Sequence, residues 1–216
     1  MATLGEAHGI EATQVNHLAG APPEELKILA SYHSDIREVT DDEVAMLESD
    51  RHVYKQHIPP TDHNLDALRH LPKAVLLRDP EDIVQAYGRA QARKLQNEFP
   101  EFAGYEGREA WLARAEEVGL LDDLRWFHDR WAEEAERFPE TTKVIHFADL
   151  IERPRHVVNE VETILGLPLS QEVELAKERY SGRPPVYYKL RNLRIALFRI
   201  KQKIPILRWF SLTPRR

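Results

Sequence analysis

The sequence predicts an α/β fold in which a small parallel β-sheet is flanked by helices. Two short, nearly continuous apolar runs, at residues 73–77 and 143–147, are typical of parallel strands covered on both faces. Longer amphipathic segments separate these runs, and strands that alternate with helices indicate parallel pairing. The chain has 216 residues, of which 42% are hydrophobic and 31% are charged. This length and composition suit one folded domain with its own core, rather than a disordered or fibrous chain.

The predicted strands are bounded by residues that interrupt strands. Residues 73–77 (KAVLL) lie between a proline and a turn-prone Asp-Pro pair, and residues 143–147 (KVIHF) follow a proline and two threonines. A weaker candidate strand, residues 52–57, stops just before two consecutive prolines. We therefore expect up to three strands in the parallel sheet, each ending in a short loop.

Helix signals fill the intervals between the strands. Asp79 can cap a helix that has Pro80 at its first position and runs to about Phe99. Residues 108–137 are rich in helix formers and are expected to divide into two helices near Gly119. In the second of these helices, three aromatic residues are expected to belong to the core and not to a ligand-stacking site: Trp126, Phe127 and Trp131.

The last part of the predicted domain, which extends over residues 1–185, contains two further helices. One covers residues 155–165, with Gly166 as its left-handed stop. We expect Asp149 to have a structural role as the cap of this helix. Ser170 is expected to cap the other helix, because two acidic residues follow in its first turn.

Composition excludes several classes of protein. The absence of cysteine excludes disulfide bonds, thiolate nucleophiles and zinc sites with cysteine ligands. The ten histidines include no pair four residues apart with an acidic residue nearby, so we expect no metal site. No apolar run approaches the roughly 18 residues that a membrane-spanning helix needs. The first residues also lack the pattern of a signal peptide, and we expect a cytoplasmic protein.

Three segments of the chain carry a distinctive order of motifs. Residues 54–60 (YKQHIPP) place a lysine and a histidine at a strand end, in the pattern K-x-H-x-P. Residues 74–84 (AVLLRDPEDIV) join an apolar strand to R-D-P-x-D-I and a helix. Residues 144–154 (VIHFADLIERP) end a late strand, and residues 164–168 (ILGLP) end the next helix. In this order and spacing, the segments resemble the family of sulfotransferases that use 3'-phosphoadenosine 5'-phosphosulfate (PAPS), over roughly residues 1–168.

The resemblance implies roles for three residues. His57 would act as general base toward a hydroxyl group of the acceptor, and Lys55 would stabilise the sulfuryl group. Arg78 would bind the 3'-phosphate of PAPS, the co-substrate, through its planar guanidinium. The acceptor would be a hydroxyl-bearing small molecule, lipid or glycan. Without the resemblance, His57 is an ordinary surface histidine, and Arg78 is a partner of Asp79 or Asp82.

The phosphate loop of the family, P-[KR]-S-G-[ST]-[ST], is missing from this sequence. Its backbone N–H groups hold the 5'-phosphate of the nucleotide, but the nine glycines here form no such loop. Residues 1–6 resemble the helix that follows the loop. Ala86 stands where many members of the family have a serine that also contacts the 3'-phosphate. We therefore expect a P-loop-type sulfotransferase architecture that lacks the first strand and the phosphate loop, with weak activity or none.

Two explanations of the missing loop stay open. The true start of the protein lies upstream of residue 1, or the chain is a degenerate relative that binds a ligand or partner without catalysis. We favour the first explanation, because loss of a central strand exposes a sheet edge and apolar helix faces. The genomic sequence directly upstream of residue 1 distinguishes the two.

The C-terminal segment carries most of the charge asymmetry. Residues 177–216 hold twelve of the 30 basic residues and one of the 36 acidic residues, a local net charge of +11 that leaves −17 on the first 176 residues. Residues 186–216 form a basic amphipathic tail with an apolar stripe at helical spacing. The tail can dock on the acidic body, bind an anionic membrane surface, or bind an acidic glycan. Nucleic acid is disfavoured as a partner, because no recognition motif accompanies the charge.

Overall fold

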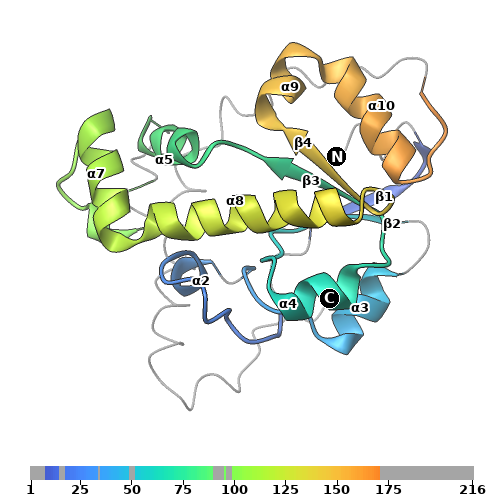
Figure 1. Cartoon of the computed structure of the whole chain (residues 1–216), viewed down its shortest axis with the longest axis horizontal. Helices are drawn as coiled ribbons and strands as arrows, with labels where there is room; N and C mark the ends of the chain where they lie inside the picture. The colour runs from blue at the N-terminus through green and yellow to red at the C-terminus, as the bar shows by residue number, and fades with distance from the viewer. Residues whose placement is uncertain are drawn as a thin grey trace.

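The computed structural model describes residues 8–14, 18–33, 35–48, 52–89, 95 and 99–170 (Figure 1). Its strands are β1 (Glu11–Gln14), β2 (His52–Lys55), β3 (Lys73–Leu77) and β4 (Thr142–His146). Its α-helices are α2 (Leu29–Tyr32), α3 (Asp41–Leu47), α4 (Asp62–Leu68), α5 (Pro80–Arg89), α7 (Arg108–Val118), α8 (Leu120–Arg137), α9 (Phe147–Glu152) and α10 (Pro154–Ile164). This order of elements confirms the predicted α/β class with a small parallel sheet flanked by helices.

The strands form two parallel pairs. β1 pairs with β2 from Glu11 opposite His52 to Gln14 opposite Lys55. β3 pairs with β4 from Lys73 opposite Thr142 to Leu77 opposite His146. No hydrogen-bonded ladder joins β2 to β3 within the described part of the chain, so the expectation of a single sheet is corrected. β1 was not predicted from the sequence, because its four residues read EATQ and contain no apolar run.

The predicted strand boundaries need small corrections. β3 coincides with the predicted run at residues 73–77, whereas β4 begins and ends one residue before the predicted range 143–147. β2 ends at Lys55, so the last two residues of the predicted strand belong to the following loop. Ala74 and Leu76 lie on the same face of β3 and are both exposed, Leu76 to 54%, so the prediction that this strand is covered on both faces is wrong for that face.

The predicted helix signals at Asp79 and Gly119 are confirmed. The carboxylate of Asp79 accepts a hydrogen bond from the backbone N–H of Asp82 (2.9 Å), which confirms it as the cap of α5. The described part of that helix ends at Arg89, and most of the remainder of its predicted range lies outside the described residues. Gly119 adopts a φ of 82° between α7 and α8, where the division was predicted.

Two further expectations concern α10 and the residues after it. Gly166 has a φ of 65° just beyond the helix, as a left-handed stop requires. The prediction that Asp149 caps α10 is wrong, because Arg153 occupies the cap position and its guanidinium instead donates a hydrogen bond to Asp149 (2.6 Å). The helix expected after Ser170 and the basic tail at residues 186–216 lie outside the described residues.

The long helix α8 organises the core. It runs along β3 and β4, while α9 and α10 lie on the other side of these strands and α2, α3 and α4 lie on the far side of α8 (Figure 1). Trp131 on α8 is buried with Leu65 and Leu77, and Phe127 packs against this cluster. Trp126 packs against a second, larger cluster that includes Val84 and Phe99. The aromatic residues of α8 are therefore part of the core, as predicted, although they serve two clusters. No helix in this described part is long and apolar enough to cross a lipid bilayer.

A partly buried lysine lies at the start of β3. The ammonium group of Lys73 donates to the carbonyl oxygens of Leu68 (3.0 Å) and Leu71 (2.8 Å). Leu68 is the last residue of α4, and Leu71 lies just beyond it. Burial lowers the pKa of Lys73 to about 8; the charge of Glu134 raises this pKa and the charge of Arg69 lowers it. The fold therefore penalises the charged form of this side chain.

Lys73 is expected to make stability depend on pH. Its pKa of about 8 in the folded protein lies below the ordinary 10.5, so the unfolded chain binds more protons between these values. The free energy of unfolding should therefore rise with pH across this window, and Lys73→Met should remove that part of the rise. Urea unfolding at several pH values measures it, with the exposed Lys27→Met as control. An unchanged pH dependence in Lys73→Met would contradict the assignment.

Candidate active site

The predicted catalytic residues lie at the end of β2. Lys55 is the last residue of the strand and is exposed, and His57 follows two residues later in the loop. The Nδ1 atom of His57 lies 2.6 Å from Oδ2 of Asp35, a contact that the sequence analysis did not predict. The side chain of His57 is 58% exposed, whereas that of Asp35 is 18% exposed. The site therefore presents an accessible imidazole with a partly buried carboxylate behind it.

The loop that carries His57 is fixed by side chains from two helices. Three successive carbonyl groups, of residues 58–60, each accept a hydrogen bond. The donors are Nε1 of Trp131 (3.2 Å), Nδ2 of Asn64 (2.8 Å) and Nε of Arg130 (3.3 Å). Both prolines of this loop are buried. A backbone held at three consecutive positions gives His57 a defined position beside α4 and α8.

A second set of contacts ties the segment that contains Asp35 to the same loop. Nε2 of Gln56 donates to the carbonyl of Asp35 (3.2 Å). The side chain of Asn64 accepts from the backbone N–H of Val39 (2.8 Å) and donates to the carbonyl of Arg37 (3.2 Å). Asn64 is fully buried, so its amide joins the two segments where water does not compete. These hydrogen bonds hold the segment that contains Asp35 beside the loop of His57, so the two side chains lie in contact.

The guanidinium of Arg37 stabilises the turn that contains Asp35. Its Nη1 atom donates to the carbonyl oxygens of Ala30 (2.9 Å), His33 (2.9 Å) and Ile36 (2.6 Å). These contacts hold the end of α2 and the residues after it in one compact turn. The turn places the carboxylate of Asp35 toward the loop after β2.

The charge of Asp35 is favoured by its surroundings. Burial by itself raises the pKa of this carboxyl group, but the hydrogen bond from His57 and the nearby charges of His57 and His33 outweigh it. The pKa of Asp35 therefore lies below its ordinary value of 3.8, and the group is ionised at neutral pH.

Arg78 lies directly after β3, beside the start of α9. Because Leu77 is opposite His146 in the β3–β4 register, the residues that directly follow the two strands, Arg78 and Phe147, are also close. The guanidinium of Arg78 stacks on the ring of Phe147 at 4.5 Å from its centroid. Its Nε atom is buried and makes no hydrogen bond within the described residues, which also contain no ion pair from Arg78 to Asp79.

The structure therefore places the three predicted residues in two settings. Lys55 and His57 follow β2, and Arg78 follows β3, which belongs to a different strand pair. His57 contacts Asp35 and Arg78 contacts Phe147, and no hydrogen bond or ion pair joins the histidine to the arginine in the part of the chain that is described. Each nevertheless lies just beyond the carboxyl end of a parallel strand, where ligands bind in α/β folds.

A cavity of about 480 Å³ opens elsewhere, between the start of β4 and α10. Lys143, His156 and Leu169 contribute to its lining, and none of the three predicted site residues does. Lys143 and His156 already contact Glu160, at 2.6 Å from the lysine and 3.6 Å from the histidine. The cavity is therefore separate from the candidate site around His57.

No protein-family model matches this chain, and no curated protein matches its sequence. Among the residues that the structure describes, no three His, Asp or Glu side chains gather as metal ligands.

Proposed function

We propose that this protein transfers a sulfuryl group from PAPS to a hydroxyl group of a small molecule, lipid or glycan. The observation that carries the proposal is the accessible His57 at the carboxyl end of β2, held by a loop anchored at three carbonyls and backed by Asp35. In the transfer, the acceptor oxygen bonds to sulfur while the bond from sulfur to the phosphate oxygen breaks. The hydroxyl proton passes to the imidazole.

The proposed architecture is that of a P-loop-type sulfotransferase without its first strand and phosphate loop. Two features support it. The parallel strands are split into two pairs, as a sheet that lacks an intervening strand would be, and Leu76 presents an exposed apolar side chain on β3. The motifs at His57 and Arg78 follow one strand of each pair.

The roles of Lys55 and Arg78 follow from charge and position. The exposed ammonium of Lys55 lies two residues from His57 and can approach the sulfuryl oxygens, where negative charge develops. Arg78 is oriented by its stacking on Phe147, and its buried Nε has an unused donor that fits the 3'-phosphate of PAPS. A loop for the 5'-phosphate is not found in the sequence, so we expect PAPS to bind weakly.

His57→Ala is expected to abolish sulfate transfer and to leave PAPS affinity nearly unchanged, because the imidazole moves a proton and does not hold the nucleotide. The measurement is transfer of labelled sulfate from PAPS to a panel of hydroxyl acceptors, with PAPS binding followed by calorimetry. His70→Ala is the matched control, since His70 is 56% exposed and also contacts a carboxylate, that of Glu48 at 2.7 Å. Equal transfer by His57→Ala and the unaltered chain would refute the role.

Arg78→Ala is expected to weaken PAPS binding by about 10- to 100-fold, the loss that a charged hydrogen bond to phosphate represents. The same calorimetric titration measures it, with 3'-dephosphorylated nucleotide as the comparison ligand. The two proteins should bind that ligand equally. An equal loss with both ligands would contradict a contact to the 3'-phosphate.

The competing function is a non-catalytic module that binds an anionic membrane surface or a protein partner through residues 186–216. The missing phosphate loop and the net charge of +11 on residues 177–216 favour it. Sedimentation with vesicles of anionic lipid tests it. The full chain should sediment, and replacement of Arg199, Lys201 and Lys203 by Gln should reduce sedimentation. Equal sedimentation of the two proteins would remove this alternative.

A further inference from the structure

We propose that Asp35 is a positioning residue that sets the tautomer and the ring orientation of His57. In this arrangement Nδ1–H donates to the Asp35 carboxylate, and Nε2 is unprotonated and faces the acceptor. The inference rests on the proposed function for its catalytic consequence, but the tautomer itself is a property of the protein that can be measured without any substrate.

The geometry of the contact supports this assignment. The distance of 2.6 Å between Nδ1 and Oδ2 is that of a short, charge-assisted hydrogen bond. An ionised carboxylate only accepts hydrogen bonds, so the hydrogen in this contact belongs to the imidazole. When His57 is neutral, its single ring hydrogen must therefore lie on Nδ1, and Nε2 keeps its lone pair. That lone pair is what a general base needs.

Two other histidines share only one half of this arrangement. His128 contacts Asp129 through Nδ1, but that acid is 71% exposed, and His8 contacts the buried Glu162, but through Nε2. His52, His70 and His156 approach acidic side chains through Nε2, the outer nitrogen, and those acids lie 26–74% exposed. His57 instead uses Nδ1, the nitrogen next to its own backbone, toward the 18% exposed Asp35. The contact therefore leaves the outer nitrogen available on a side chain that is mostly exposed.

Asp35 is itself held in place, as a positioning residue must be. Gln56 binds its carbonyl, and the buried amide of Asn64 joins the following residues to the loop of His57. His33 lies near enough that its charge also favours the ionised carboxylate. A carboxylate fixed on the inner side of the ring prevents the imidazole from rotating. It also stabilises the positive charge that forms when Nε2 takes a proton.

In the proposed reaction, His57 accepts one proton and Asp35 accepts none. During transfer the hydroxyl proton of the acceptor moves to Nε2 as its oxygen bonds to sulfur, and His57 becomes an imidazolium ion. Asp35 stays ionised and takes up no proton. After release of the sulfate ester and of 3'-phosphoadenosine 5'-phosphate, the imidazolium returns the proton to water.

The test is nuclear magnetic resonance of the full chain labelled with ¹⁵N, at a pH where the histidines are neutral. We expect the His57 ring of the unaltered protein to show a protonated Nδ1 and an unprotonated Nε2. Asp35→Ala should remove this preference, and the spectrum should move toward the Nε2–H form that free imidazole side chains favour. His70, whose Nε2 contacts Glu48, should show the opposite tautomer and should not change in Asp35→Ala.

Asp35→Asn preserves the shape of the side chain, and it replaces Asp35→Ala in this test if Asp35→Ala does not fold. A protonated Nε2 on His57 in the unaltered protein would overturn the inference, and so would a tautomer that is the same in both Asp35 variants and the unaltered chain. If transfer is measurable, Asp35→Ala should lower kcat by about 10²-fold with PAPS affinity unchanged. Absence of transfer in the unaltered protein would refute the proposed function but not the role of Asp35. The measurement of the His57 tautomer tests that role separately.

Discussion

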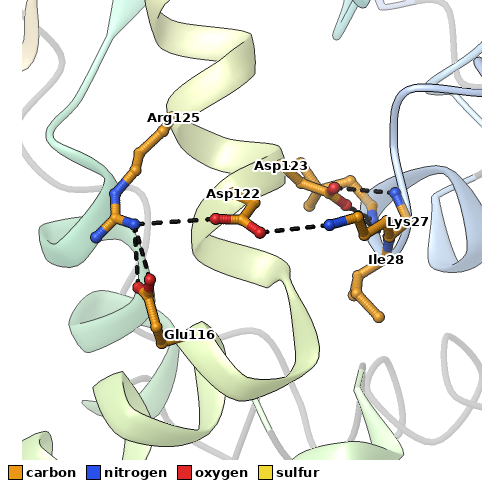
Figure 2. Close-up of polar contacts among 7 residues, drawn as sticks. Lys27, Ile28, Glu116, Asp122, Asp123 and Arg125 are labelled. Carbon is orange, nitrogen blue, oxygen red and sulfur yellow. Dashed lines mark hydrogen bonds and ion pairs between the residues drawn. The ribbon is translucent and has the colours of Figure 1, made fainter.

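Asp123→Ala is expected to lower the free energy of unfolding by about 4 kcal/mol. The carboxylate of Asp123, on α8, is 1% exposed and accepts hydrogen bonds from three consecutive backbone N–H groups. The donors are Lys27 (2.9 Å), Ile28 (2.6 Å) and Leu29 (2.9 Å), at the start of α2 (Figure 2). The first turn of α2 has no side-chain cap of its own, so Asp123 provides the cap from a distant helix.

The size of this effect follows from what the substitution leaves behind. Alanine removes the acceptor for three N–H groups in an enclosed site, and each unsatisfied donor there costs free energy. The negative charge near a helix N-terminus is lost as well.

The neighbouring aspartate supplies a matched control. Asp122 is 53% exposed and contacts Lys27 at 3.4 Å and Arg125 at 4.0 Å, as Figure 2 shows. Ion pairs at such exposed positions contribute little, so Asp122→Ala should change stability by no more than about 0.5 kcal/mol. Urea unfolding followed by circular dichroism compares the two variants. Equal losses of stability in Asp122→Ala and Asp123→Ala would contradict a stabilising role for the hydrogen bonds that Asp123 accepts from the start of α2.

Asn64→Ala is expected to lower the free energy of unfolding by about 3 kcal/mol and to disturb the candidate active site. The fully buried side chain of Asn64 bonds the backbone of Val39, Arg37 and Pro59. Its removal leaves a buried N–H group and two carbonyl groups without this partner. The loop after β2 and the segment that contains Asp35 should therefore no longer be held at fixed positions relative to each other.

This second prediction has two measurements and one control. Urea unfolding gives the stability loss, and the ¹⁵N signals of the His57 ring should broaden or shift, because the contact with Asp35 depends on both segments. Asp66→Ala, on the same helix, is the control: that side chain is 69% exposed and pairs with Arg69, and its removal should cost no more than about 0.5 kcal/mol. A stable Asn64→Ala variant with unaltered His57 signals would contradict the positioning argument.

The candidate active site was only half predictable from the sequence. His57, Lys55 and Arg78 stand in short motifs at strand ends, so their approximate positions follow from local pattern. Asp35 and Asn64 stand in no such pattern. Asp35 contacts a residue 22 positions away, and Asn64 bonds the backbone of Val39 25 positions away, and no spacing rule for a helix or strand links residues so far apart.

The sequence by itself determined the α/β class, the position of β3, the cap at Asp79 and the helix stops at Gly119 and Gly166. The class follows from the alternation of strand and helix patterns along the chain, and each of the other features depends on residues within a turn or two of each other. Tertiary structure alone decided that the strands form two pairs, that Asp123 caps α2, and that His57 meets Asp35. The reason is the distance along the chain over which each kind of interaction acts. Backbone geometry and capping act between near neighbours in the chain, whereas pairing and buried hydrogen bonds depend on which distant segments the folded core brings together.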